Sequence, residues 1–187
     1  MSRFPLGDVA SLPDDLRSRL EEVTEKSGFL PNVFAVMAHR PAELRAFLAY
    51  HDATMEGTES LSAADREMIV VATSAARDCT YCVVAHGAIL RVRARDPLLA
   101  DLVATNYRHA PLSDRQRAML DYAVKLSLTP ELVEQADLDG LFAAGFSQDD
   151  AWDISAVVSF FALSNRMALA TGMMPNPEFH LMGRLPR

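Results

Sequence analysis

Apolar residues recur along the chain with the three- and four-residue spacing of amphipathic helices. In residues 13–28, Leu16, Leu20 and Val23 fall on one stripe, and Gly28 follows as a residue that commonly ends a helix. No segment combines an alternation of period two with a hairpin turn, so nothing indicates a strand. The pattern predicts an all-α fold.

Capping residues mark where several helices begin. Three serines are followed three residues later by an acidic or amide side chain, as in a capping box: Ser62 with Asp65, Ser113 with Gln116, and Ser147 with Asp150. Other helices open on a proline, whose missing amide donor costs nothing in the first turn: Pro31, Pro41 and Pro97. The helix that follows the last of these serines is predicted to be the longest and to end at Gly172.

The chain is predicted to form one domain, residues 1–187, because its 187 residues are enough to bury a core without staples. Residues 1–12 are expected to form an extended N-terminal arm, and residues 173–187 an extended, proline-containing C-terminal tail. The sequences LSAADREM at 61 and LSDRQRAM at 112 share the pattern Leu-Ser-x-x-x-Arg-x-Met. This similarity is open to two interpretations, an internal helical repeat or capping chemistry common to two helix starts.

The charge balance and the start of the chain argue against several functions. The formal net charge is −7 and the pI is about 5.2, with no basic stripe, which argues against nucleic acid as a partner. The first residues do not resemble a secretory signal, and no run of about 18 apolar residues predicts a membrane span. The protein is therefore expected to be cytoplasmic, where thiols stay reduced. Its 50% hydrophobic content suits a helical subunit of an oligomer.

The two cysteines stand three positions apart, and a histidine follows the second by four residues. On a helix, Cys79, Cys82 and His86 share one face. Cα atoms one turn apart lie about 5 Å from each other, within the range of a reversible disulfide. As a staple this disulfide would contribute at most about 2 kcal/mol, because it closes a loop of only four residues. The pair is therefore better suited to chemistry than to holding the fold.

Metal binding is the main alternative for this cluster. Cys-x2-Cys with His86 offers three zinc ligands, but structural zinc sites usually take further ligands from another element. The chain has no second cysteine pair, and its other histidines form no paired ligand motif: His39, His51, His109 and His180. Attachment of haem would require a histidine directly after the second cysteine, where Val83 stands.

Redox chemistry explains the cluster best. Asp78 is expected to cap the cysteine helix, which places Cys79 in the first turn, where free amides favour a thiolate. His86 can accept the proton of Cys82 and then hold the thiolate as an ion pair. One cysteine attacks an oxidised substrate, and the other condenses with the resulting sulfenic acid. The residues alone favour Cys79 as the attacking thiol, because it is expected to be the more exposed.

Glu67 is the candidate partner of His86, provided that the chain turns between them. On one unbroken helix Glu67 would lie about 18 Å from Cys79. A break near Arg77 and Asp78 would fold two helices into an antiparallel hairpin and bring Glu67 close to His86. A carboxylate there would orient the ring and stabilise its charged form. The alternative is that Glu67 is a first-turn acid that only favours the helix dipole.

Two further side chains are candidates for a proton relay or a substrate pocket. Tyr81 lies between the cysteines and could donate a hydrogen bond to the site, and His51 is either a pocket residue or a core histidine. The aromatic residues of the longest helix are expected in helix packing or subunit contacts: Trp152, Phe160 and Phe161. Asn165 and Arg166 interrupt the apolar face of that helix and are expected to form hydrogen bonds within an interface.

Together these residues resemble a known family. Glu67, Cys79, Cys82 and His86 match the spacing E-x11-C-x2-C-x3-H of the alkylhydroperoxidase D-like branch of the carboxymuconolactone decarboxylase family. The segments REMIVVATSAARDCTYCVVAHGA, LSDRQRAMLDYAVKLSLTP and FFALSNRMALATG are similar to its peroxidase-related proteins. The resemblance extends from about residue 40 to residue 175, and the spacing of the four residues is its most specific part.

The resemblance implies a fold, a reaction and partners. The fold would be an AhpD-like helical bundle with a Cys-x-x-Cys helical hairpin, assembled as a homo-oligomer, commonly a trimer or hexamer. The reaction would be a thiol-dependent reduction of small organic hydroperoxides, in which Cys82 is the peroxidatic residue, Cys79 resolves, and Glu67 with His86 forms the proton relay. The reductant would be an external dithiol of the dihydrolipoamide type or a lipoyl-bearing protein, with no haem, flavin or metal.

One departure from the family pattern bears on this reaction. Better-studied members have a relay histidine where this chain has Tyr81, which puts the efficiency and the preferred substrate in question. Two other functions stay open. One is a decarboxylase-like or lactone-handling enzyme in which His86 is the base, and the other is a non-catalytic protein that binds metal or senses redox state.

Overall fold

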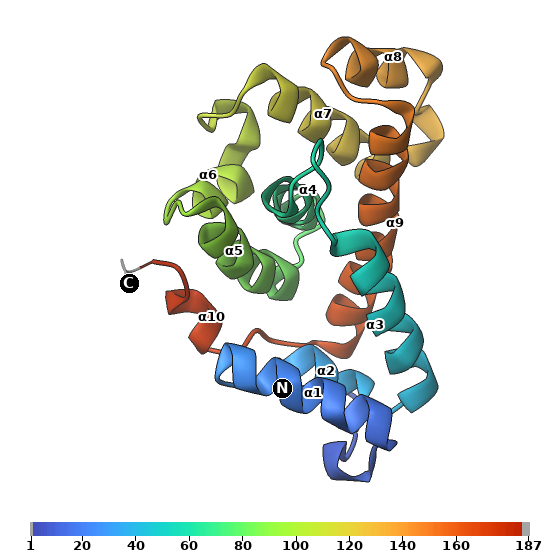
Figure 1. The fold of residues 1–187 in the computed structure, drawn as a ribbon, viewed down its shortest axis with the longest axis vertical. Coiled ribbons are helices and arrows are strands. Elements are labelled where there is room, and N and C mark those ends of the chain that lie inside the picture. The colour runs from blue at the N-terminus through green and yellow to red at the C-terminus, as the bar shows by residue number, and fades with distance from the viewer. Residues whose placement is uncertain (1, 185–187) are drawn as a thin grey trace.

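Helices make up the regular structure of the part of the chain that the computed structural model describes, residues 2–184 (Figure 1). This confirms the all-α prediction. The α-helices are α1 (Asp14–Ser27), α2 (Asn32–Met37), α3 (Pro41–Met55), α4 (Ala63–Ala75), α5 (Thr80–Ala94), α6 (Leu99–Asn106), α7 (Asp114–Leu128), α8 (Gln135–Ala143), α9 (Gln148–Thr171) and α10 (Glu178–Leu181). Short 3-10 helices are η1 (Val9–Ser11), η2 (Tyr107–His109) and η3 (Pro130–Leu132).

Helix α4 is the centre around which the other helices pack. Figure 1 shows it nearly end-on, surrounded by α5, α6, α7 and α9, and α4 contacts all four. Nine consecutive residues of α4, from Arg66 to Ser74, are buried. A helix that is buried on all sides carries its polar residues into the interior together with its apolar ones. Glu67 is therefore only 4% exposed.

Local sequence signals determine where the helices begin and end. The three serines predicted to start helices, Ser62, Ser113 and Ser147, each form a complete capping box. Gly28 and Gly172 end α1 and α9 in the left-handed region, with φ of 84° and 66°. Both classes of prediction are confirmed, because caps depend on contacts within a few residues. Whether α4 and α7 reflect an internal repeat stays a prediction.

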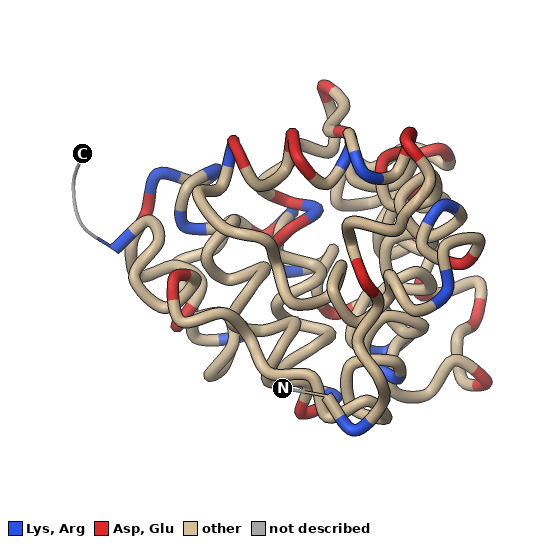
Figure 2. The backbone as a smooth tube through the Cα atoms, turned by 90° about the horizontal axis from the view of Figure 1, so that it is seen from below, with Lys and Arg blue, Asp and Glu red and all other residues tan. Residues whose placement is uncertain are grey.

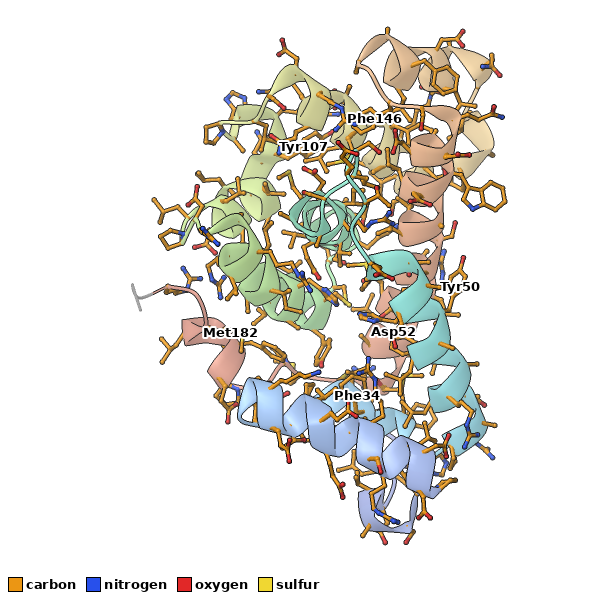
Figure 3. The ribbon with its side chains drawn as sticks, viewed as in Figure 1. Phe34, Tyr50, Asp52, Tyr107, Phe146 and Met182 are labelled. Carbon is orange, nitrogen blue, oxygen red and sulfur yellow. The ribbon has the colours of Figure 1, made fainter. Side chains whose placement is uncertain are left out.

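The apolar side chains form three clusters. The largest joins α4 to α6, α7 and α9, the second surrounds the two cysteines, and the third joins α1, α2 and α3. Figure 3 shows Tyr107 and Phe146, of the first cluster, at one end of the molecule, and Phe34, which packs on the third, toward the other. The cysteine cluster is built from residues of α2, α5, α9 and the C-terminal segment. This placement puts both thiols inside the protein.

The N-terminal arm is not simply extended. It contains η1 and buries Leu12, and the amide of Gly7 donates to the carbonyl of Ala35 at 3.0 Å. A Cβ atom at Gly7 would lie 2.1 Å from the backbone carbon of Ala38, so only glycine fits. The arm is thus packed against the end of α2. Met1, the first residue of the predicted arm, lies outside the described residues.

The C-terminal tail was predicted to be extended, which is wrong for residues 178–181. They form α10, which buries Phe179 and packs its ring edge-to-face on Phe29, with centroids 4.9 Å apart. The buried guanidinium of Arg91 donates to the carbonyls of Phe179 at 2.8 Å and Met182 at 2.9 Å. These long-range contacts give a short helix a stability that its own sequence does not supply. Residues 185–187 of the tail lie outside the described residues.

The structure shows how charged and apolar residues are distributed over the fold. Figure 2 shows acidic and basic positions interspersed along the chain rather than gathered in one basic band. By length and composition alone α9 could cross a membrane, with a mean hydropathy of 1.3 over its most apolar window. Half of that window is buried within the fold, as in the core helix of a soluble protein, so α9 is only a weak indication of a membrane span.

Replacing Gly7 with alanine tests how firmly the arm is docked. We expect Gly7→Ala to lower the free energy of unfolding by about 1–3 kcal/mol, because its methyl group would overlap backbone atoms that cannot move aside alone. Gly140→Ala is the matched control. Gly140 lies within α8 with no atom within 4 Å of the added Cβ, so alanine should raise stability by about 0.5–1 kcal/mol. Chemical denaturation measures both, and an unchanged midpoint for Gly7→Ala would contradict the docking.

Candidate active site

The cysteine pair lies at the start of α5, where Cys79 ends the connection from α4 and Cys82 lies in the first turn. Asp78 adopts a left-handed conformation with φ of 55°. The amide of Asp78 donates to Ala75 and that of Cys79 donates to Ser74, which is the Schellman pattern that closes a helix. The prediction that Asp78 caps α5 is therefore wrong, because this residue ends α4. The N-cap of α5 is Cys79, and the helix begins at Thr80.

Both thiols are buried. Cys79 is 0% exposed and Cys82 is 1% exposed, so the expectation that Cys79 is the more accessible thiol is wrong. The cause is the packing of α2, α9 and the C-terminal segment over the start of α5, which no local pattern indicates. The two cysteines are not joined by a disulfide in this structure, and they lie close enough for the Cys82 thiol to form a hydrogen bond with the Cys79 sulfur.

The two thiols differ in how readily they lose a proton. The hydrogen bond from Cys82 lowers the pKa of Cys79 from 9.0 to about 7, against the opposing effect of burial. The amides of Cys82 and Tyr81 at the start of α5 and the charge of His86 act in the same direction as the hydrogen bond. The neighbouring Cys79 and burial both raise the pKa of Cys82. The pair therefore loses its first proton near neutral pH, and the resulting negative charge is held mainly on Cys79.

Glu67 and His86 are in direct contact. The turn at residues 76–79 packs α5 against α4, and His86 Nδ1 lies 2.8 Å from Glu67 Oε2. An ionised carboxylate only accepts hydrogen bonds, so Nδ1 carries the hydrogen and Nε2 is the nitrogen that can exchange a proton elsewhere. Phe161 packs edge-to-face on the imidazole, with centroids 4.6 Å apart. The ring is thereby fixed by a carboxylate at its Nδ1 atom and by an aromatic ring.

The His86 ring makes no hydrogen bond with either thiol in the described part of the chain. The predicted direct proton transfer from Cys82 to His86 is thus not seen in this conformation. His86 does act electrostatically on Cys79, whose pKa it lowers. Its side chain is 13% exposed, whereas both cysteines are sealed. Of the three, His86 is the group that reaches toward solvent.

A buried polar cluster around Cys82 was not anticipated from the sequence. The hydroxyls of Ser164 and Ser74 lower the pKa of the Cys82 thiol against the larger effects that raise it. Ser74 also donates to Asn165 Oδ1 at 3.0 Å, and Asn165 is 2% exposed. Asn165 was assigned to an interface, but it supports the thiol site instead. The interruption of an apolar helix by Ser164 and Asn165 was the available signal, since buried polar groups need partners.

The other two candidate residues, Tyr81 and His51, differ in burial and in their contacts. Tyr81 is 6% exposed, and its hydroxyl accepts a hydrogen bond from the amide of Val33 at 3.1 Å rather than contacting the relay. The His51 side chain is 35% exposed and lies 6.1 Å from the ring of Phe160. Burial lowers the pKa of His51, and so does the charge of His86, while Glu67 raises it. His51 therefore lies on the same side of the molecule as the His86–Glu67 pair.

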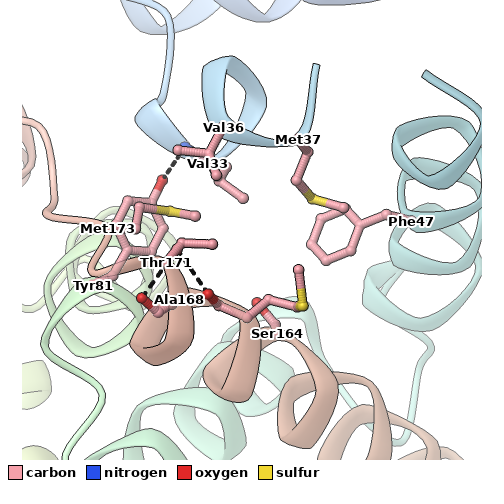
Figure 4. Close-up of a pocket in the computed structure, with 10 residues that line it drawn as sticks. Val33, Val36, Met37, Phe47, Tyr81, Ser164, Ala168, Thr171 and Met173 are labelled. Carbon is pink, nitrogen blue, oxygen red and sulfur yellow. Dashed lines mark hydrogen bonds between the residues drawn. The ribbon is translucent and has the colours of Figure 1, made fainter. Parts of the chain in front are cut away.

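A small apolar cavity adjoins the thiol site. Its lining includes Val33 and Met37 of α2, Tyr81 of α5, and Ser164 of α9 (Figure 4). It encloses about 10 Å³, about the space of one water molecule. Ser164 connects this cavity to the Cys82 thiol. Among residues 2–184, no three His, Cys, Asp or Glu side chains are arranged to hold a metal ion.

Fold and site together define an all-helical protein with a buried cysteine pair beside a paired histidine and glutamate. Residues 41–123 match the family model for the carboxymuconolactone decarboxylase family. A search of curated proteins gives no match. Two solved structures align with nearly the whole chain, beyond the residues that the family model matches. The chain belongs to this family, in its alkylhydroperoxidase D-like, peroxidase-related group.

Two solved structures carry the assignment to that group. The chain is 57% identical to a peroxidase-related protein of Ralstonia eutropha JMP134, described as an alkylhydroperoxidase AhpD core, over 100% of this chain and 98% of that one, with a TM-score of 0.96. It is 43% identical to a peroxidase-related protein of Silicibacter sp. TM1040, over 97% and 94%, with a TM-score of 0.90. The debrominase Bmp8, solved with 2,3,4-tribromopyrrole, is 20% identical over 90% and 89%, with a TM-score of 0.73, and shares the fold.

The coupling between the thiols predicts a pH dependence that alkylation can measure. Only thiolates react, so the rate of alkylation by iodoacetamide should rise with pH through a midpoint of about 7, the pKa of Cys79. Cys82→Ala removes the hydrogen bond that contributes most to this low pKa, and the midpoint should move up toward 9.0. Cys79→Ala is the matched variant, in which the pKa of Cys82 should fall because its negative neighbour is gone. Equal midpoints in all three proteins would show that the thiols are not coupled.

Proposed function

We propose that this protein is a thiol-dependent hydroperoxidase that reduces small organic hydroperoxides through Cys79 and Cys82. The observation that carries the proposal is the set of four groups brought together by α4 and α5. A hydrogen bond from the Cys82 thiol lowers the pKa of Cys79, and His86 and Glu67 form a hydrogen-bonded pair on the same two helices. The family includes peroxidase-related proteins, which agrees with this chemistry.

The proposed reaction begins with a thiolate on Cys82. The negative charge on Cys79 moves to Cys82 when the proton in the hydrogen bond between them crosses to Cys79. The Cys82 sulfur then attacks the terminal oxygen of the hydroperoxide, so that an S–O bond forms and the O–O bond breaks. The leaving alkoxide takes up a proton, which gives an alcohol and a sulfenic acid on Cys82.

The second step closes a disulfide. The Cys79 thiol loses its proton, and its sulfur attacks the Cys82 sulfenic acid, so that the S–O bond breaks and water leaves. An external dithiol then reduces the disulfide by exchange and becomes oxidised itself. Over one cycle a hydroperoxide and a dithiol become an alcohol, water and a disulfide. No haem, flavin or metal is needed in this scheme.

The attack is assigned to Cys82 rather than Cys79 because of what each thiol contacts. Cys82 lies beside Ser164, a residue of the cavity wall, whereas Cys79 stands at the N-cap of α5. The amides at the start of α5 can hold the charge on Cys79 until it is needed. The spacing that this chain shares with its family also assigns the peroxidatic role to the second cysteine.

His86 and Glu67 are proposed to supply and remove the protons of both steps. Glu67 holds the Nδ1 side of the ring, which leaves Nε2 to protonate the alkoxide and to accept the proton of Cys79. A dihydrolipoamide-type dithiol or a lipoyl-bearing protein is the proposed reductant. The His86 imidazole is partly exposed, so it would face a dithiol that approaches the cysteines from solvent.

A homo-oligomer, a trimer or hexamer, is proposed as the working form. Several large apolar side chains of α9 are exposed on the single chain: Trp152, Leu163, Met167 and Leu169. Exposed apolar groups along one helix are more typical of a subunit interface than of a monomer surface. Light scattering should give a mass of about three or six chains of 20.6 kDa. The mass of one chain would contradict the proposal.

Thiol titration and trapping test the order of the two cysteines. One equivalent of an organic hydroperoxide should remove both titratable thiols of the native protein. Cys79→Ser should stop at a sulfenic acid on Cys82 that dimedone traps, and Cys82→Ser should form none. A dimedone adduct on Cys79 in the Cys82→Ser protein would reverse the assigned roles. Hydroperoxide consumption by the protein with both cysteines changed to serine would instead exclude a thiol mechanism.

The proposed proton relay is tested by replacing the Glu67 carboxylate with an uncharged amide of the same shape. Glu67→Gln should lower the rate of dithiol-dependent hydroperoxide reduction by about 100-fold, the low end of what positioned acid–base groups contribute. Asp137→Asn is the control, because Asp137 pairs with Lys125 at 2.7 Å between α7 and α8, away from the site. It should retain normal turnover. Equal rates for the two variants would remove Glu67 from the mechanism.

A further inference from the structure

The thiol pair lies under a cover built from two distant parts of the chain. Val36 of α2 is buried in the same apolar cluster as Cys79 and Cys82, and Val33 packs against that cluster. The C-terminal segment supplies further apolar residues of the same cluster: Met173, Phe179 and Met182. The adjoining cavity of about 10 Å³ is far smaller than the roughly 300 Å³ or more of ordinary ligand pockets. Neither an organic hydroperoxide nor a dithiol can therefore reach the sulfurs unless this cover moves.

Helix α2 is fixed to the cysteine helix by the Tyr81 hydroxyl. α2 has only six residues, its N-cap is Pro31, and no side chain of its own caps it. The amide of Val33 is one of the first-turn donors that a helix leaves unsatisfied. Tyr81 reaches across from α5, and its hydroxyl accepts this hydrogen bond at 3.1 Å, drawn as a dashed line in Figure 4. The residue between the two cysteines thus holds the cover in place.

The same end of α2 is bound to the C-terminal segment. Asn176 Oδ1 accepts the amide of Asn32 at 2.7 Å, and Asn176 Nδ2 donates to the carbonyl of Leu30 at 3.0 Å. The side chain of Asn32 donates in turn to the carbonyl of Met174 at 2.9 Å. The first two amides of α2 are therefore held by Tyr81 and Asn176. These ties link both parts of the cover to each other and to the cysteine helix.

We propose that Tyr81 is a positioning residue that keeps α2 closed over the thiol pair and so sets how often Cys79 and Cys82 become accessible. The opening serves the hydroperoxidase reaction, and in that respect the inference rests on the proposed function. The closed cover itself is independent of any activity. Tyr81 occupies the position of the family's relay histidine, but its hydroxyl caps a helix. Burial raises the pKa of Tyr81, so it stays protonated at neutral pH and exchanges no proton there.

The proposal predicts how the alkylation rate responds when the tie is removed. If opening and closing are fast, the rate is the intrinsic rate multiplied by the fraction of open molecules. A hydrogen bond contributes about 0.5–1.5 kcal/mol, so its loss should raise that fraction about two- to tenfold. The pH midpoint should stay where it is, because Tyr81 does not take part in the proton equilibrium of the thiols. A relay role would move the midpoint instead.

Tyr81→Phe and Tyr122→Phe make a matched pair for this test. Both tyrosines are buried, 6% and 7% exposed, and each hydroxyl forms one hydrogen bond, that of Tyr122 with Ser155 at 2.7 Å between α7 and α9. Iodoacetamide should alkylate the cysteines of Tyr81→Phe about two- to tenfold faster than those of the native protein. Tyr122→Phe should react at the native rate. Hydrogen exchange should also accelerate in residues 32–37 of Tyr81→Phe.

Three results would overturn the proposal. Alkylation of Tyr81→Phe at the native rate, equal acceleration in both phenylalanine variants, or a shifted pH midpoint would each do so. Should Tyr81→Phe fail to fold, Asn176→Ala removes the other tie to α2 and must accelerate alkylation in its place. Faster alkylation in a protein that consumes no hydroperoxide would support the cover and reject the proposed function. The two ideas can thus fail separately.

Discussion

A carboxylate buried inside a protein needs a partner, and for Glu67 that partner is His86. The need arises because α4 is buried over nearly its whole length, so that its polar residues cannot turn toward water. Burial of an unpaired carboxylate would cost several kcal/mol, whereas the contact of 2.8 Å provides a hydrogen bond to the charged group. The same contact fixes the register of α5 against α4. The position of the cysteines, seven and four residues before His86, follows from it.

The parts of this site that the sequence predicts are those decided within a few residues. The three serine caps and the glycine ends of α1 and α9 follow from local spacing. The break between α4 and α5 was also predictable, and so was the meeting of Glu67 with His86. Asp78 was misplaced because an acid before a helix and an acid after one look alike in a sequence. Only the left-handed φ of 55° distinguishes them.

The parts that the sequence did not predict depend on contacts across long distances in the chain. The burial of both thiols and the formation of α10 each require partners from distant parts of the chain. The hydrogen bond of the Val33 amide with the Tyr81 hydroxyl joins residues 48 positions apart. No local pattern encodes such a partner. Asn165 is instructive, because its interruption of an apolar helix was visible although its partner, Ser74, was not. A buried polar residue in a sequence indicates that a partner exists without saying where.

The bond between Asn32 and Asn176 spans 144 residues, and it carries a consequence for synthesis. A ribosome adds residues in order, so Cys79 and Cys82 emerge long before the segment that covers them has been made. Until residues 173–182 have left the ribosome, the cover over both sulfurs lacks its C-terminal part. Closure therefore waits for residues 173–182, and a chain interrupted before them would be left with open, oxidisable cysteines.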